Sequence, residues 1–243
     1  MSFYDLLILQ IIAHLLADFV FQNDLWIRHR NRFEYRSKIL YWHVLIVFVL
    51  SWLLSFQLWF ALASLAISII HFLVDGAKAK VSRLKIRKTK PFERRIFFID
   101  QFIHLAVIFP AVYAYTAFWN ISPYLNWNIE SKYLLIILGY LFCLKPANIL
   151  IKEIFNFYRL KNISHMGYNL LNAGKLIGNI ERILTLSLIL SGQFSSVGFI
   201  IAAKSIIRFK DTEVHKTEYM LIGSLLSFGI AILIGMGIKR FGF

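Results

Sequence analysis

The chain has 243 residues, of which 58% are hydrophobic and only 16% are charged, and its mean hydropathy is +0.64. A soluble domain of this length needs more polar surface, so the composition excludes one and predicts apolar area that faces lipid. The net charge of +14 does not by itself indicate nucleic-acid binding, because lysine and arginine also gather in the cytoplasmic loops of membrane proteins. The sequence has no zinc-finger or RNA-binding motif, so no nucleic-acid partner is expected.

Four hydrophobic spans are predicted in the first half of the chain. The first runs from about Phe3 to Gln22 and is followed by a basic loop. No Asp, Glu, Lys or Arg occurs from Ile39 to Val74, which is long enough for two spans that turn near Ser55–Gln57. A second, more basic stretch separates this pair from the fourth span, at about Ile96–Phe118.

The second half of the chain has a weaker pattern. A fifth span covers about Lys132–Ile151, and Lys145-Pro146 near its end predicts a kink. The sixth and seventh segments, Ile183–Leu190 and Val197–Ile207, are short, so they form either two thin spans or a re-entrant hairpin. The last span is about Met220–Ile238.

These segments predict an all-α fold, a polytopic transmembrane bundle of about eight hydrophobic segments. We expect a four-helix half over residues 1–118 and a second helical half over residues 132–243, joined in a single membrane unit. The first, third, fifth and seventh connections are rich in Lys and Arg, and the others are not. The positive-inside rule therefore predicts that the basic loops are cytoplasmic and that the N-terminus lies outside.

Three His–Asp pairs with a four-residue spacing occur in the first four spans, where chance gives about 0.35 such pairs. The spacing puts both members of a pair on one helix face. With the predicted topology, the pairs and one lone histidine lie at a similar depth near the cytoplasmic boundary. The residues are His14 and Asp18, His71 and Asp75, Asp100 and His104, and the lone His43.

This layer predicts a metal site. Buried carboxylates need compensating positive charge, and the first four spans contain no Lys or Arg, so a divalent cation is the expected partner. Mixed nitrogen and oxygen ligands suit Zn²⁺, Mn²⁺ or Fe²⁺, and seven ligands suit one or two ions. One of Asp18, Asp75 and Asp100 could instead act as a general base toward metal-bound water. Gln22 and Gln101 are weaker candidates for nearby contacts.

Two alternatives to metal binding remain open for this layer: a proton or ion pathway, and structural His–Asp bonds at helix ends. A second charged group lies in the C-terminal half. Arg182, Lys204 and Arg208 could bind an anionic lipid or phosphate. They could equally pair with Glu181 and Glu218.

The same residues resemble a bacterial family of uncharacterised integral-membrane proteins, the domain-of-unknown-function 3307 family. The segments that carry this resemblance are His14–Gln22, His71–Asp75, Asp100–His104, Gly178–Arg182, Lys204–Phe209 and Glu218–Tyr219. The resemblance implies a bacterial inner-membrane protein and brings no established activity. In the style of its site, the first half is also similar to small membrane-bound metal-dependent hydrolases.

We therefore expect a membrane-embedded metal-dependent hydrolase with a cytosol-facing site that acts on a lipid or lipid-linked phosphate. One alternative is a proton- or metal-ion-coupled transporter, which would need polar residues in the outer halves of the first four spans, where the sequence shows almost none. Another is a non-enzymatic membrane platform that binds a cytosolic partner or anionic lipid. Membrane lipids are expected partners, and the oligomeric state stays open.

Overall fold

The computed structural model describes residues 1–83, 90–119, 121–125, 127–158, 168–208 and 214–242. Within these ranges the regular elements are all helices, which confirms the predicted all-α class. Five described helices are long and apolar enough to cross a membrane, or six if one bent pair is a single span. The chain is therefore a multi-pass membrane protein, and the predicted number of eight segments stays a prediction. It forms two compact units, Met1–Leu134 and Leu135–Phe243.

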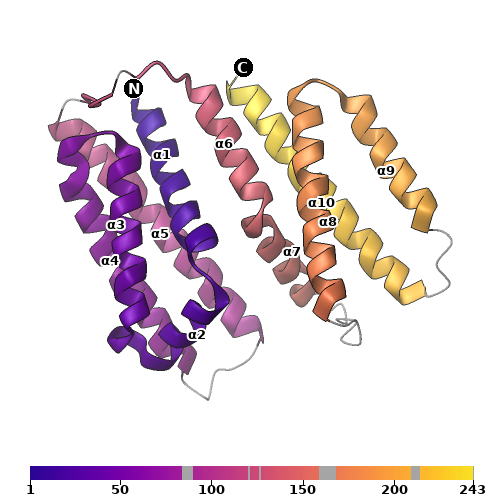
Figure 1. Ribbon diagram of the computed structural model, residues 1–243, viewed down its shortest axis with the longest axis horizontal. Helices are drawn as coiled ribbons and strands as arrows, with labels where there is room; N and C mark the ends of the chain where they lie inside the picture. Colours follow the sequence, from indigo (N-terminus) through magenta and orange to yellow (C-terminus); the bar gives the residue numbers. More distant parts are fainter. Residues whose placement is uncertain (84–89, 120, 126, 159–167, 209–213, 243) are drawn as a thin grey trace. The chain divides into compact units, whose positions relative to one another are not determined.

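Unit 1 is built on four long helices that lie side by side (Figure 1). They are α1 (Phe3–Leu15, continued by a π-helical turn over Leu16–Phe21), α3 (Lys38–Ser55), α4 (Ala61–Arg83) and α5 (Lys90–Phe118). The four apolar stretches, Phe3–Phe21, Lys38–Ser55, Leu58–Ser82 and Pro91–Phe118, lie close to the first four predicted spans. Helix α1 contacts both α3 and α5, and α4 contacts both of them as well.

The segment after the first span is a helix, so the prediction of a plain basic loop there was wrong. Helix α2 (Asp24–Phe33) starts at Asn23, whose Oδ1 accepts a hydrogen bond from the Trp26 backbone N–H at 2.9 Å. Helix α2 packs on α3 and α4 at one end of unit 1 (Figure 1). The many arginines of this segment predicted a loop because they give it no clear apolar face. In the structure Arg30 is buried and Arg28 is exposed, so arginines lie on both faces of the helix.

Unit 2 begins inside a broken helix. Helices α6 (Ser131–Cys143) and α7 (Lys145–Phe157) are bent by 46° relative to each other. Pro146 lies in the first turn of α7, where its missing N–H costs least, and this confirms the predicted kink. The fifth predicted span is thus a pair of helices joined at Leu144.

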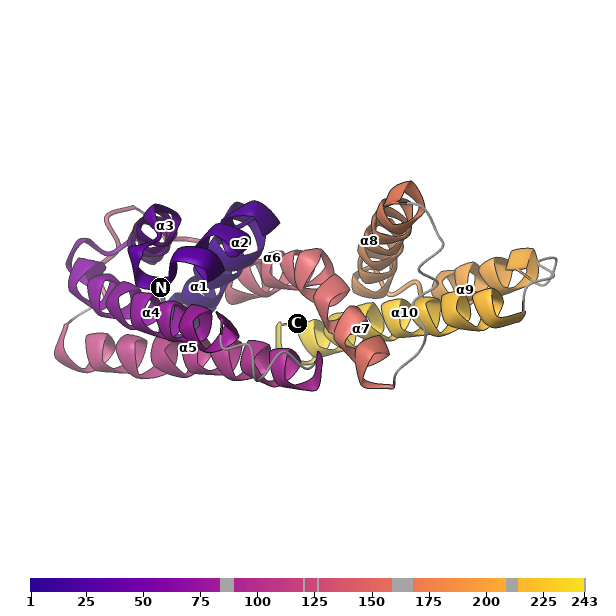
Figure 2. The ribbon, with the colours of Figure 1, turned by 90° about the horizontal axis from the view of Figure 1, so that it is seen from below.

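The rest of unit 2 consists of α8 (Tyr168–Leu190), α9 (Phe194–Arg208) and α10 (Val214–Gly242). Helix α8 has 23 residues, so it begins well before the predicted apolar run Ile183–Leu190, and it is not among the described helices that are apolar enough to cross a membrane. Helix α9 has 15 residues, fewer than the roughly 20 that span a bilayer. It packs against α8 and lies beside α10 (Figure 2). The turn from α8 to α9 uses Gly192 at a φ of +76°, a conformation that glycine adopts without strain.

Candidate metal centre

The π-helical turn at the end of α1 positions the central carboxylate of the site. His14 lies in the last turn of α1, and Asp18 lies in the wider turn that follows, Leu16–Phe21. Such π-helical turns are rare in proteins, and those that occur are often found at functional sites. Asp18 Oδ1 lies 3.3 Å from His43 Nε2 and 3.4 Å from His71 Nε2. Three helices, α1, α3 and α4, thus deliver one ligand atom each to the same point.

The three donor atoms are spaced as ligands of one small cation. His43 Nε2 and His71 Nε2 are 3.0 Å apart, a distance at which one nitrogen can also donate a hydrogen bond to the other. Metal–ligand bonds of about 2.0–2.1 Å in a tetrahedron give ligand–ligand distances of about 3.3 Å. The observed values of 3.0, 3.3 and 3.4 Å bracket that length. Asp75 Oδ2 lies 3.6 Å from both imidazole nitrogens.

Two further histidines surround this triad. His14 Nδ1 lies 4.0 Å from Asp18 Oδ1, and His104 Nδ1 lies 3.8 Å from Asp18 Oδ2. The rings of His71 and His104 are stacked with centroids 3.8 Å apart. The ligand atoms form three overlapping groups, each within 4.8 Å. The groups are His14, His71 and His104; Asp18, His43 and His71; and Asp75, Asp100 and His104. The structure thus gathers all seven predicted residues, and their binding of a metal stays a prediction.

Several polar atoms at this centre are buried without a hydrogen-bond partner in the described part of the chain. They are Asp18 Oδ1, Asp100 Oδ1, His43 Nδ1 and both ring nitrogens of His104. Most buried polar groups in proteins are paired, and an unpaired one calls for a water, an ion or a functional role. The unpaired oxygen of Asp18, which faces both imidazole nitrogens, therefore fits a bound cation.

Two protein cations neutralise two of the three carboxylates, which corrects the expectation that only a metal ion could do so. Arg30 Nη1 donates to Asp75 Oδ2 at 2.5 Å, and Lys78 Nζ donates to Asp100 Oδ2 at 2.6 Å. Among the described groups, three carboxylates and two cations leave one negative charge, which is centred on Asp18. Arg30 escaped prediction because it lies in α2, outside the predicted spans. Lys78 lies one helical turn beyond Asp75 on α4, and this spacing could have predicted that its ammonium group lies near the site.

Gln101 links the two outer parts of the centre. Its Nε2 donates to Asp18 Oδ2 and to Asp100 Oδ2, both at 3.2 Å. Its Oε1 lies 3.3 Å from His14 Nε2. The predicted contact of Gln101 with the site is therefore present. The weaker prediction for Gln22 stays a prediction.

Tyr35, which follows α2, packs closely against α4 and fixes this part of the chain. The Tyr35 hydroxyl donates to the Leu73 carbonyl at 3.0 Å, and its ring lies directly on Gly76. A Cβ at Gly76 would overlap that ring. The glycine next to Asp75 thus permits the approach that keeps the helix of Arg30 over the site.

Polar side chains continue beyond the histidines into unit 1, so the expectation that its outer part has almost none was wrong. Ser51 Oγ donates to Gln10 Oε1 at 2.6 Å and lies 2.9 Å from Ser64 Oγ. Gln10 Nε2 donates to the Ser51 carbonyl at 3.0 Å. Gln10 precedes His14 by one turn and Ser51 follows His43 by two turns, so these residues continue the inward stripes of α1 and α3. A search of the spans for ionisable residues misses them because serine and glutamine carry no charge.

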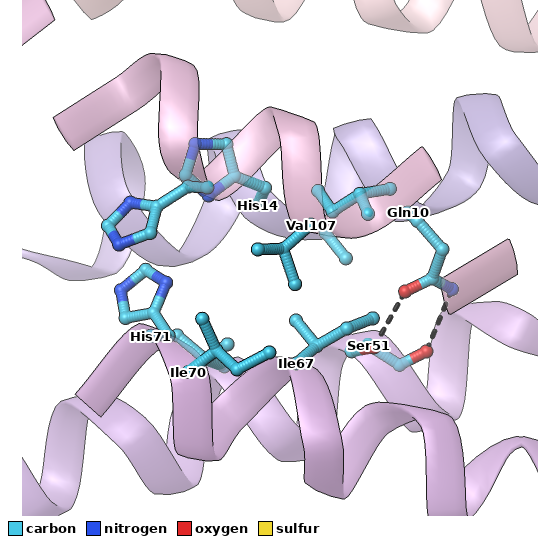
Figure 3. A pocket seen from close by; sticks show the side chains of 11 residues that line it. Gln10, His14, Ser51, Ile67, Ile70, His71 and Val107 are labelled. Atoms are coloured by element: carbon cyan, nitrogen blue, oxygen red, sulfur yellow. Dashed lines mark hydrogen bonds between the residues drawn. The ribbon is translucent and has the colours of Figure 1, made fainter. Parts of the chain in front are cut away.

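A small cavity connects this polar group with the histidines. Figure 3 shows His14 and His71 at one end, the Gln10–Ser51 pair at the other, and apolar Ile67, Ile70 and Val107 between them. Its volume is about 20 Å³, which is room for one water molecule. A water there would lie beside the imidazoles of the metal centre.

The predicted anion-binding arginine in unit 2 instead joins the broken helix. Arg182 is 1% exposed, and its Nε donates to the Cys143 carbonyl at 2.5 Å. Its Nη2 donates to Asn148 and Asn179 at 2.7 Å, and its Nη1 donates to Ser227 Oγ at 2.9 Å. The guanidinium thus donates to the Cys143 carbonyl at the break between α6 and α7 and to polar side chains of three helices. These bonds contradict the prediction that Arg182 is available to a substrate.

Lys204, which was predicted to bind an anion, lies beside a carboxylate in the described structure. Lys204 Nζ pairs with the Glu181 carboxylate and lies 5.5 Å from the centre of the Phe228 ring. This is the alternative in which the charges of the C-terminal half neutralise each other. The side chains of Arg208 and Glu218 lie outside the described residues.

Replacing Arg182 with leucine is expected to destabilise unit 2 by about 3 kcal/mol, because two carbonyls and two asparagines lose a buried donor. Unfolding of detergent-purified protein with increasing SDS measures this difference. Arg240→Leu, which removes an exposed cation from α10, is the control and should change little. Equal unfolding midpoints for the two variants would show that the Arg182 network carries no stability.

Comparison with known proteins identifies one family. The family model described as a protein of unknown function, DUF3307, matches residues 6–135, which is more than half of the chain. The match covers the helices that supply the metal centre. No curated protein and no solved structure matches the chain.

Proposed function

The chain belongs to the DUF3307 family, whose function is unknown, and we propose that its unit 1 is a membrane-embedded metal-dependent hydrolase. The observation that carries this proposal is the triad of His43, His71 and Asp18, with donor atoms 3.0–3.4 Å apart. Two histidines and a carboxylate leave a coordination position open, as in catalytic rather than structural zinc sites. The water-sized cavity beside His71 supports an open side.

The charge balance supports a hydrolytic role. The described groups leave one net negative charge at the centre when the imidazoles are neutral, and a divalent cation held there would compensate it. Such an ion would supply a nucleophile near neutral pH by lowering the pKa of a water molecule. In this proposal Asp18, His43 and His71 hold the ion, and Asp75, fixed by Arg30, orients the imidazoles or accepts a proton. Lys78 and Gln101 hold Asp100 beside them.

The proposed substrate is a lipid or lipid-linked phosphate at the cytoplasmic face of the bacterial inner membrane. Support comes from the end of unit 1 that holds the site, where Arg28, Arg32 and Lys80 are exposed. The positive-inside rule places such an end in the cytoplasm, with the N-terminus outside. A phosphate ester at the head-group level would meet both the cations and the metal centre. Zn²⁺, Mn²⁺ and Fe²⁺ are the ions proposed for the site.

Phosphate release from lipid phosphates tests the proposal. Purified protein in mixed micelles with phosphatidic acid or a polyprenyl diphosphate is expected to release phosphate only when Zn²⁺, Mn²⁺ or Fe²⁺ is present. His43→Ala should reduce the rate by more than about 100-fold, because loss of outer-shell partners alone costs 10–100-fold. Release that is equal in His43→Ala, or that survives complete chelation, would contradict the hydrolase.

A second candidate function is passage of protons or metal ions through unit 1. It is favoured by the buried group of Gln10, Ser51 and Ser64 beyond the histidines, and by the cavity between the two. A route through a bilayer needs such polar partners inside the bundle. In the hydrolase, these polar side chains would serve only to hydrogen-bond a water molecule beside the histidines.

Metal flux into proteoliposomes separates the two functions. If unit 1 is a transporter, Ser51→Val should lower the uptake of Mn²⁺ or Zn²⁺ about tenfold while the metal content of the protein stays unchanged. Thr116→Val on α5 is the matched control, because the Thr116 hydroxyl donates to the Tyr113 carbonyl of its own helix and has no other hydrogen bond to a described residue. Uptake no faster than in protein-free vesicles would exclude the transporter.

A further inference from the structure

Helix α2 lies in the connection between two candidate membrane spans. The first span ends at Phe21 and the next begins at Lys38, so α2 lies in a connection between two spans at one membrane face. A ten-residue helix is about 15 Å long, and it packs across α3 and α4. It therefore lies against the end of the bundle at the level of the lipid head groups.

The outer face of α2 combines apolar and basic side chains. Leu25 is 69% exposed and Phe33 is 44% exposed. Arg28 and Arg32 are exposed beside them, and Asp24 is the exposed acidic residue of the helix. Apolar side chains flanked by arginines are typical of helices that lie in the interface and bind anionic lipids.

The inner face of α2 carries the residue that reaches the metal centre. Arg30 is 4% exposed and donates to Asp75. His29 Nδ1 and Ser37 Oγ are 2.8 Å apart, which fixes the end of the helix to the start of α3. Arg30 lies two residues from both Arg28 and Arg32, so the inner and outer cations belong to one rigid element.

We infer that α2 is an interfacial helix whose outer face binds anionic lipid head groups through Arg28 and Arg32. The membrane is the occupant of this face because the spans on either side hold α2 at its surface and because the exposed charge is positive. Head-group binding holds α2 in position and so maintains the hydrogen bond from Arg30 to Asp75. The lipid composition therefore controls the charge at the metal centre. The part of the inference that concerns metal affinity rests on the proposed function; the lipid binding does not.

A fluorescent label on α2 tests the lipid binding. The single cysteine, Cys143, is buried, so Cys143→Ser with Leu25→Cys gives one labelled position on the outer face. In nanodiscs, emission of an NBD label is expected to shift to the blue when phosphatidylglycerol is added to phosphatidylcholine. Arg28→Gln with Arg32→Gln should raise the phosphatidylglycerol needed by about thirtyfold, since each arginine near the surface contributes about a factor of five. Lys152→Gln with Lys175→Gln, at exposed lysines of unit 2, should leave it unchanged.

Metal affinity in the same nanodiscs separates the two proposals. Tighter metal binding with phosphatidylglycerol, lost in the Arg28/Arg32 double variant, supports the coupling. A lipid-dependent label shift without any bound metal would overturn the proposed function and leave the lipid-binding helix standing. An emission that is the same in both lipids would overturn the inference. So would a lysine control whose phosphatidylglycerol requirement rises as much as that of the Arg28/Arg32 double variant.

Discussion

Replacing Asp18 with asparagine is expected to remove the bound ion and leave the fold intact. Asp18 is the one carboxylate of the centre without a described cationic side chain, and its Oδ1 lies within 3.4 Å of two imidazole nitrogens. The change keeps the shape of the side chain but removes the negative charge that balances the ion. We expect metal affinity to fall by more than about 100-fold, beyond the 10–100-fold of outer-shell changes.

Elemental analysis of purified protein measures this loss, and gel filtration with circular dichroism reports the fold. Asp5→Asn is the matched control on the same helix. Asp5 is also a buried carboxylate, but it caps α1 by accepting from the Ser2 backbone N–H at 2.6 Å and from Ser131 Oγ at 2.5 Å. It should retain the metal. Full metal content in Asp18→Asn would refute the centre, because no other described carboxylate lies as close to both imidazole nitrogens.

The same comparison shows which parts of the site could be predicted from the sequence. His–Asp pairs four residues apart share a helix face whatever the tertiary packing, so the spacing located His14, Asp18, His71, Asp75, Asp100 and His104. Span prediction then placed them at one depth. Helix propensity and hydropathy are local properties, and both apply directly to helices that are long and apolar.

The parts that could not be predicted depend on contacts between distant residues. The Arg30–Asp75 bond joins positions 45 residues apart, and it requires α2 to fold back onto α4. The role of Arg182 depends on the break at Leu144 and on Asn148 and Asn179 around it. The sequence alone does not show whether an arginine or lysine will bind a substrate or will donate to the carbonyls at a helix end.

Neutralisation by protein cations changes the number of ions expected at the centre. Seven ligand groups suggested one or two metal ions, but Arg30 and Lys78 occupy two of the three carboxylates. A second divalent ion beside the guanidinium of Arg30 and the ammonium of Lys78 would be repelled at short range. We therefore expect about one ion per chain, held by the triad at Asp18. Lys78 then stands where a two-metal site would hold its second ion.

Removing that ammonium group is expected to create the second site. Lys78→Ala leaves Asp100 without its 2.6 Å partner, beside Asp75 and His104 with ligand atoms within 4.8 Å of one another. A buried carboxylate that loses its partner costs about 3–5 kcal/mol, and a divalent cation at this point would recover that energy. The metal content should rise from about one to about two ions per chain.

Two measurements distinguish this outcome from simple damage to the protein. With Mn²⁺, the wild type should give the electron paramagnetic resonance spectrum of an isolated ion, and Lys78→Ala the spectrum of a coupled pair. The variant should also be less stable than the wild type without metal and recover on metal addition. Lys80→Ala, at an exposed lysine two residues further along α4, should change neither property. An unchanged metal content with unchanged stability would show that Lys78 does not act as the second cation, because the carboxylate of Asp100 would then need no cationic partner beside Gln101.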